Sequence, residues 1–192
     1  MRPDLKWTAL LSPPGDAGRY PKEMNVRLEP LPYLPRKQDN VVNLDDGNGT
    51  TTSEGCVLRC WLDDTHCWIA NAKPGNGYAM SITPWPYANA HIWIARGAVY
   101  LLRIDQAYSW TYYDDLGIAC YIAHDPKHAF IATYTDVICL DSAGFIHWRT
   151  PVAIDGIEFL GETDGWLELN CCDDPPDVWR PRRVSIRDGA IG

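Results

Sequence analysis

The chain has 192 residues, of which 46% are hydrophobic and 22% charged, and its formal net charge is −8 at pH 7. These values are ordinary for a soluble globular protein of one domain. No run of about 18 uninterrupted apolar residues occurs, which excludes a membrane-spanning helix. The start at Met1 lacks the apolar stretch of a secretory signal, so we expect a cytoplasmic protein that does not contact a membrane.

The first 45 residues are predicted to form an extended, proline-rich arm that packs on the domain formed by residues 46–192. Seven prolines lie within the first 35 residues, and such a density prevents a regular helix or a central strand. Val41 and Val42 form a short apolar patch, which a polar loop rich in Gly, Asn and Thr follows.

Beyond the arm, short apolar segments rich in β-branched and aromatic residues alternate with turns. Strands are predicted at residues 56–62, 66–70, 78–82, 91–95, 98–104, 108–113, 117–123, 129–140, 145–150, 157–160, 166–170 and 178–186. This spacing indicates an all-β single domain of about 10–12 short antiparallel strands, arranged as a sandwich or an incomplete propeller-like array. No window has an apolar stripe of helical period over three turns.

The segment 129–150 has the pattern of a β-hairpin around an Asp-Ser-Ala-Gly turn. Its part from Val137 to Trp148 resembles a blade hairpin of quinoprotein-type β-propellers. The resemblance implies that Asp141 begins the turn, that Gly144 takes a positive φ and that Trp148 packs between blades. The stretch 134–166 is also similar to small uncharacterised bacterial β-rich proteins. Since a closed propeller needs at least four blades of about 40 residues, we expect neither closure nor a quinone cofactor.

The seven cysteines are irregularly spaced, at positions 56, 60, 67, 120, 139, 171 and 172. Cys56, Cys60, His66 and Cys67 are all zinc-ligand types. On an extended strand, however, Cys56 and Cys60 would lie about 13 Å apart, too far for one ion. We therefore expect no metal and predict free thiols in a reducing cytosol.

Acidic residues gather in the second half of the chain. Between residues 104 and 177 there are fourteen acidic and two basic residues, and four arginines then follow at positions 180, 182, 183 and 187. An acidic face repels phosphate backbones, so a nucleic-acid partner is not expected, whereas a basic protein partner would suit it. Alternatively, these charges belong to turns and solvated strand faces, and the arginines neutralise the acidic strands nearby.

The sequence has no signature of nucleophilic catalysis, because it contains neither a G-x-S-x-G elbow nor a P-loop. We therefore predict no catalytic residue and no cofactor. The rival hypothesis is a metal-dependent hydrolase or small-ligand binder with a pocket near His124 and His128, where Pro126 indicates a turn. A further alternative is a structural module of a larger assembly.

The preferred hypothesis is a non-enzymatic protein-binding β-domain. It could take the form of an immunity-type protein that neutralises a basic toxin such as a nuclease, because complementary charge speeds such an encounter. The nine Trp and ten Tyr are residue types favoured at interfaces. Acidic positions on predicted turns, with the aromatics beside them, are the predicted contact residues: Tyr112, Tyr113, Asp114, Asp115, Asp173 and Asp174.

Overall fold

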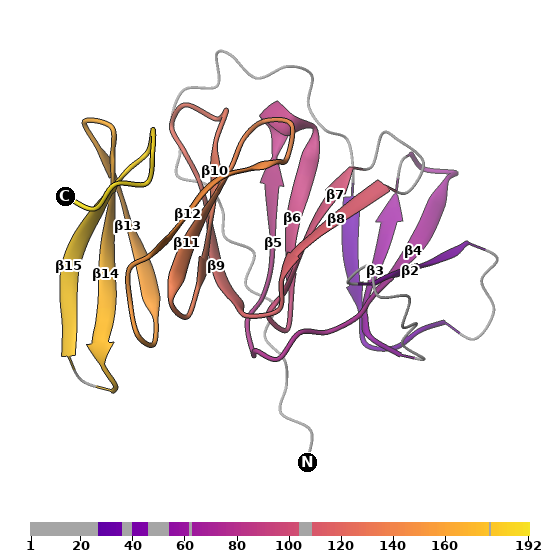
Figure 1. The fold of residues 1–192 in the computed structure, drawn as a ribbon. Helices are drawn as coiled ribbons and strands as arrows, with labels where there is room; N and C mark the ends of the chain where they lie inside the picture. The colour runs from indigo at the N-terminus through magenta and orange to yellow at the C-terminus, as the bar shows by residue number, and fades with distance from the viewer. Residues whose placement is uncertain (1–26, 36–39, 46–53, 62, 104–108, 177) are drawn as a thin grey trace.

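The protein is built from four small β-sheets that stand face to face in an open row (Figure 1). The computed structural model describes residues 27–35, 40–45, 54–61, 63–103, 109–176 and 178–192. Within these residues the regular structure is β apart from one 3-10 turn, η1 (Pro86–Ala88). The all-β class is thereby confirmed. No described segment is a helix long and apolar enough to cross a membrane.

We name the sheets A to D along the chain. Sheet A has the order β1 (Arg27–Leu31), β3 (Cys56–Trp61), β4 (Cys67–Ala72), β2 (Val41–Leu44). Sheet B contains β5 (Met80–Trp85), β6 (Ala90–Ala95), β7 (Ala98–Arg103) and β8 (Ser109–Asp114). Sheet C contains β9 (Gly117–Ile122), β10 (Ala129–Thr133), β11 (Asp136–Leu140) and β12 (Ile146–Pro151). Sheet D contains β13 (Ile157–Thr163), β14 (Trp166–Asp174) and β15 (Val178–Ser185).

Sheets B, C and D are antiparallel meanders, because each strand pairs with the next one along the chain. Sheet A is different, since β2 pairs with β4 in parallel. The prediction that all strands pair in antiparallel fashion was therefore wrong for the pair β2 and β4. The edge strands of sheet A, β1 and β2, come from residues that the sequence analysis assigns to the arm. Pro30 lies in β1, at a sheet edge where the missing N–H is tolerated, and residues 1–26 lie outside the described part.

The described residues form fifteen strands, more than the ten to twelve expected. The arm contributes two of the three extra strands, and the third arises because the predicted segment 129–140 is really the pair β10 and β11. The turn between them contains neither Gly nor Pro. It is held by the Thr133 hydroxyl, which accepts hydrogen bonds from the N–H groups of Thr135 at 3.2 Å and Asp136 at 2.9 Å. Serine and threonine turns of this kind give a weak sequence signal.

The core consists of three layers, one between each pair of neighbouring sheets. The layer between A and B includes Leu58, Trp68, Trp93, Tyr100 and Leu102. The layer between B and C includes Trp85, Ile92, Leu101, Ile131 and Ile138. The layer between C and D includes Phe130, Val137, Leu167, Leu169 and Val184. Since β6 and β10 contribute to both of their flanking layers, every residue of these two strands is buried, as expected of a strand covered on both faces.

The hairpin of β11 and β12 turns as its sequence predicts. The Asp141 carboxylate accepts hydrogen bonds from the N–H groups of Ala143 and Phe145, each at 2.9 Å, and Gly144 has a φ of +85°. Trp148 packs on Phe130, with ring centroids 5.7 Å apart. These are properties of one hairpin, and the likeness to propeller blades stays a prediction.

Candidate functional site

Three turns meet at one end of sheet B and are joined there by backbone hydrogen bonds. We call them the three-turn corner, formed by residues 73–79, 96–97 and 115–116. The Asn76 N–H donates to the Asp115 carbonyl at 3.0 Å, and the Gly77 N–H donates to the Arg96 carbonyl at 2.9 Å. The hairpin turn between β6 and β7 is thus tied to the two connections that join sheet B to sheets A and C, and loops held rigidly in this way are common sites of binding.

Gly97 makes the close approach of these turns possible. Its φ is +93°, a conformation that side chains disfavour. A Cβ atom placed there would lie 2.5 Å from the Asp115 carbonyl oxygen and 2.7 Å from the Gly77 nitrogen. The Gly97 N–H donates to the Ala79 carbonyl at 3.2 Å, and its own carbonyl accepts from the Gly117 N–H at 2.8 Å. The corner therefore packs backbone directly on backbone.

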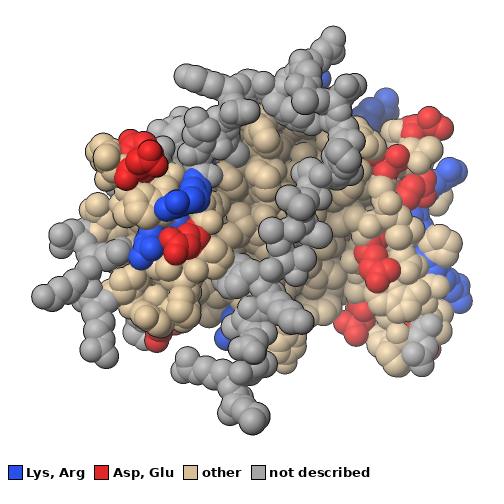
Figure 2. Space-filling view, turned by 180° about the vertical axis from the view of Figure 1, so that it is seen from behind, with Lys and Arg blue, Asp and Glu red and all other residues tan. Residues whose placement is uncertain are grey.

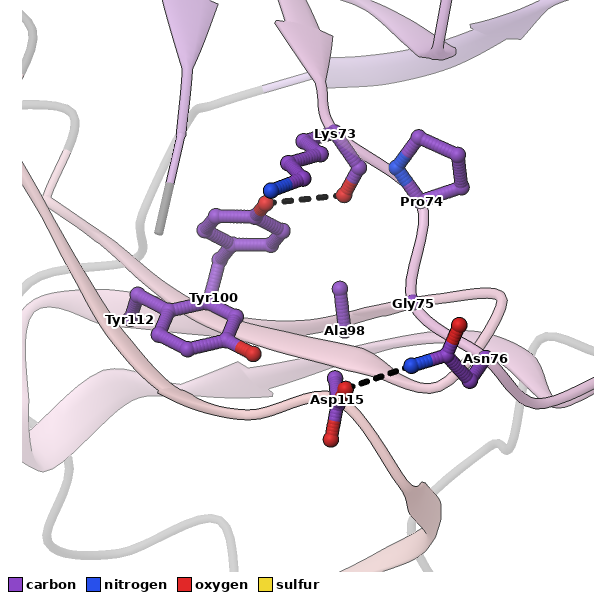
Figure 3. Close-up of a pocket in the computed structure, with 8 residues that line it drawn as sticks. All are labelled: Lys73, Pro74, Gly75, Asn76, Ala98, Tyr100, Tyr112 and Asp115. Carbon is purple, nitrogen blue, oxygen red and sulfur yellow. Dashed lines mark hydrogen bonds between the residues drawn. The ribbon is translucent and has the colours of Figure 1, made fainter. Parts of the chain in front are cut away.

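The corner contains a pocket of about 200 Å³. It is lined by Lys73, Pro74, Gly75, Asn76, Ala98, Tyr100, Tyr112 and Asp115 (Figure 3). The Asn76 side-chain amide donates to the Asp115 carboxylate at 2.6 Å, and the Tyr100 hydroxyl donates to the Lys73 carbonyl at 2.8 Å. These two bonds hold opposite sides of the pocket in place.

The rim of the corner exposes apolar side chains. Tyr78 in the first turn is 85% exposed, and Leu116 in the third turn is 40% exposed. Large apolar side chains on rigid turns are suited to act as anchors for a binding partner, because the backbone of such turns loses little conformational entropy on binding.

The predicted contact residues of β8 and the turn after it divide between the two faces of sheet B. Tyr112 and Asp115 line the pocket on the side of sheet A. Tyr113 points toward sheet C, where its hydroxyl donates to the Gly144 carbonyl. Burial raises the pKa of Tyr113 to about 12. Tyr113 therefore tethers sheet B to sheet C.

Asp114 is also engaged with sheet C. Its carboxylate lies 3.0 Å from Arg149, which in turn lies 2.8 Å from the Asp136 carboxylate. Hydrogen bonding to Asp136 is the main cause of the raised pKa of Arg149. One guanidinium thus neutralises two carboxylates. The side chain of Asp114 is 11% exposed and that of Asp136 is 17% exposed.

The other two predicted contact residues lie on sheet D, with sheet C between them and the corner. The Asp173 carboxylate is paired with Arg182 at 2.7 Å and approached by Arg180 at 3.7 Å, whereas Asp174 is exposed at the end of β14. Seen from behind, acidic and basic side chains alternate over the end of the molecule formed by sheet D (Figure 2). The structure therefore does not bring the six predicted residues together.

The two histidines of the rival hypothesis have separate partners. His124 lies 2.6 Å from the Glu162 carboxylate, and the His128 ring lies 6.0 Å from the His147 ring. Among the described residues, no group of three or more His, Cys, Asp or Glu side chains could hold a metal ion.

All seven cysteines are free, as predicted, and six of them are buried. Burial raises the pKa of the Cys56 and Cys171 thiols to about 11 and that of the Cys60, Cys120 and Cys139 thiols to about 12. Since the thiolate is the nucleophile, these five groups are inert near neutral pH.

Sequence reasoning marked two of the eight lining residues, Tyr112 and Asp115. The segment from Lys73 to Asn76 fell between the predicted strands 66–70 and 78–82, and Tyr100 was assigned only to a strand. The available signal was the run Lys-Pro-Gly-Asn-Gly, which indicates a tight turn. Its position beside Asp115 depends on how sheets A and B stack.

Comparison with known proteins does not assign the chain to a family. No protein-family model matches the chain, and no curated protein matches it. Function is therefore inferred from the geometry and charge of the described residues.

Proposed function

We propose that this protein is a non-enzymatic, cytoplasmic protein-binding β-domain whose partner is basic. The observation that carries this proposal is the three-turn corner, where Tyr78 and Leu116 are exposed on turns cross-linked by backbone hydrogen bonds. A tyrosine held on a rigid surface matches the anchors that contribute most of the binding energy at protein interfaces, and the neighbouring leucine adds apolar area that a partner can bury.

The state of the reactive side chains supports binding over catalysis. Five buried thiols have raised pKa values. Burial also lowers the pKa of His91 to about 4, so this imidazole is neutral and enclosed. The carboxylates of Asp114, Asp136 and Asp173 are occupied by arginines. Free thiols in all seven positions fit a reducing compartment such as the cytoplasm.

The basic character of the partner follows from the whole-molecule charge. The formal net charge is −8, and such a charge attracts a cationic protein over several ångströms and speeds its association. Because arginines are interspersed among the acidic side chains of sheet D, the attraction is spread over the molecule. In its concrete form, the partner is a basic toxin such as a nuclease, which this immunity-type protein would neutralise.

The test is capture of the partner by the full-length tagged protein, followed by binding measurements with variants. A double variant, Tyr78→Ala with Leu116→Ser, is expected to weaken binding at least about tenfold, equivalent to about 1.4 kcal/mol. The matched control is Tyr87→Ala, since Tyr87 is 41% exposed but lies in η1, outside the corner. The association rate should fall as salt is raised.

Three results would contradict the proposal. The first is that no protein is captured, and the second is that the captured partner is an acidic protein or a nucleic acid. The third is that a basic partner binds the double variant as tightly as it binds the Tyr87→Ala control. Hydrolysis of a substrate by the purified protein would instead favour the rival class.

A further inference from the structure

The pocket of the three-turn corner has the size of one small ring. Its volume of about 200 Å³ equals that of about seven water molecules at roughly 30 Å³ each. Pockets for drug-sized ligands are larger, at about 300–1,000 Å³. The short side chain of Ala98 lies between the longer side chains that line the pocket (Figure 3), whereas a Cβ atom on Gly75 would point into the backbone of Ala98 and Asp115.

The polar groups around the pocket both donate and accept hydrogen bonds. The Asp115 carboxylate is oriented by the Asn76 amide at 2.6 Å, and a carboxylate that receives one such bond keeps further lone pairs for a ligand. On the opposite side, Lys73 extends its ammonium group toward the Tyr100 hydroxyl (Figure 3). A ligand there would meet an acceptor on one side and a donor on the other.

The formal charges of the pocket cancel. A purely cationic ligand, such as an arginine side chain, would be attracted by Asp115 but repelled by Lys73, and an inorganic anion would experience the reverse. The lining therefore favours a neutral ligand with several hydroxyl groups, since a hydroxyl can donate to the carboxylate and accept from the ammonium group.

One aromatic ring, that of Tyr112, offers an apolar surface to the pocket. The Tyr100 ring is fully buried beside it, with the two ring centroids 5.6 Å apart at an interplanar angle of 60°. The negative face of an aromatic ring attracts polarised C–H groups. A sugar ring combines such C–H groups with hydroxyls on its rim, which is the combination that this lining complements.

From size, hydrogen bonding, charge balance and the Tyr112 ring together, we infer that this pocket binds a single sugar ring, with adjacent hydroxyls on the Asp115 carboxylate and its C–H face against Tyr112. This ligand site is distinct from the protein contact proposed above, because it uses the residues that line the pocket and not Tyr78 and Leu116.

The experiment is saturation-transfer NMR of the full-length protein with D-glucose, D-galactose, D-mannose and N-acetyl-D-glucosamine. Glycine, arginine and inorganic phosphate serve as zwitterionic, cationic and anionic controls. One small ring makes few contacts, so we expect a dissociation constant of about 1 mM for at least one sugar. Asp115→Asn keeps the shape of the side chain and removes its charge, and should weaken binding about tenfold or more.

Asp174→Asn is the matched control, since it removes a carboxylate on sheet D and should leave sugar binding unchanged. The Tyr78→Ala, Leu116→Ser double variant should also keep sugar binding, so that failure of the protein contact and failure of the sugar site are separate results. Proton spectra of each variant report whether it is folded. The inference is overturned by no sugar binding, by stronger binding of a charged control, or by equal sugar binding in folded Asp115→Asn.

Discussion

Replacing Gly97 by alanine should break the three-turn corner. Two effects add at this position. A positive φ costs a residue with a side chain roughly 1–2 kcal/mol, and the new Cβ would lie 2.5 Å from the Asp115 carbonyl oxygen and 2.7 Å from the Gly77 nitrogen. Overpacking of this kind costs about 1–3 kcal/mol. The expected loss in the free energy of unfolding is therefore about 2–5 kcal/mol.

Gly165 provides a matched control for the backbone effect. Its φ is +81°, and nothing lies within 4 Å of the position of a Cβ atom, so Gly165→Ala should lose only the roughly 1–2 kcal/mol of the positive φ. Urea unfolding followed by the fluorescence of the nine tryptophans measures both variants. If Gly97→Ala is destabilised no more than Gly165→Ala, the backbone contacts at the corner do not constrain the turns as described.

Three further predictions concern single side chains. Burial lowers the pKa of His91 from 6.5 to about 4, so between these two pH values the unfolded chain binds the proton more readily than the folded protein does. The free energy of unfolding should therefore fall by up to about 3 kcal/mol as the pH drops from 6.5 to about 4. Urea titrations at several pH values should show this dependence, and the His91→Leu variant should lose it. Arg149→Met leaves Asp114 and Asp136 without their shared cation and should lower stability by about 1–2 kcal/mol, part of which Asp136→Asn restores in the double variant. Cys67 is the one thiol that is not buried, so Ellman's reagent should modify one thiol quickly in the native protein and seven in denaturant; rapid reaction of several native thiols would contradict the stacked core.

The sequence was sufficient for the class of the fold because glycine turns and apolar runs are local signals. The turns at Arg96 and Asp164 lie in the gaps between the predicted strands 91–95 and 98–104 and between 157–160 and 166–170, with φ of 52° and 49° at these two residues; a glycine follows each of them. The Thr133 turn was missed because a hydroxyl replaces glycine. The strands of sheet A within the arm were missed because prolines outweighed the apolar residues between them.

The candidate site could be predicted only in part, because it is assembled between sheets. Asp115 lies on an acidic turn and Tyr112 is an aromatic residue of the strand before it, and both were marked for that reason. Asn76, which orients the Asp115 carboxylate, is 39 residues away in the chain, and no periodicity relates the two positions. The pairing of Asp114 with Arg149 across 35 residues is hidden in the same way, so nothing in the sequence indicates that Asp114 joins sheets B and C.

The open row of sheets determines where local unfolding of the molecule begins. Each apolar layer joins only two adjacent sheets, so local opening events couple to nearest neighbours, as in a linear array. The central strands β6 and β10 are sealed on both sides, and their amides should exchange with solvent only through global unfolding. Protection should decline stepwise toward β1 and β15, which makes the two ends the places where fraying starts.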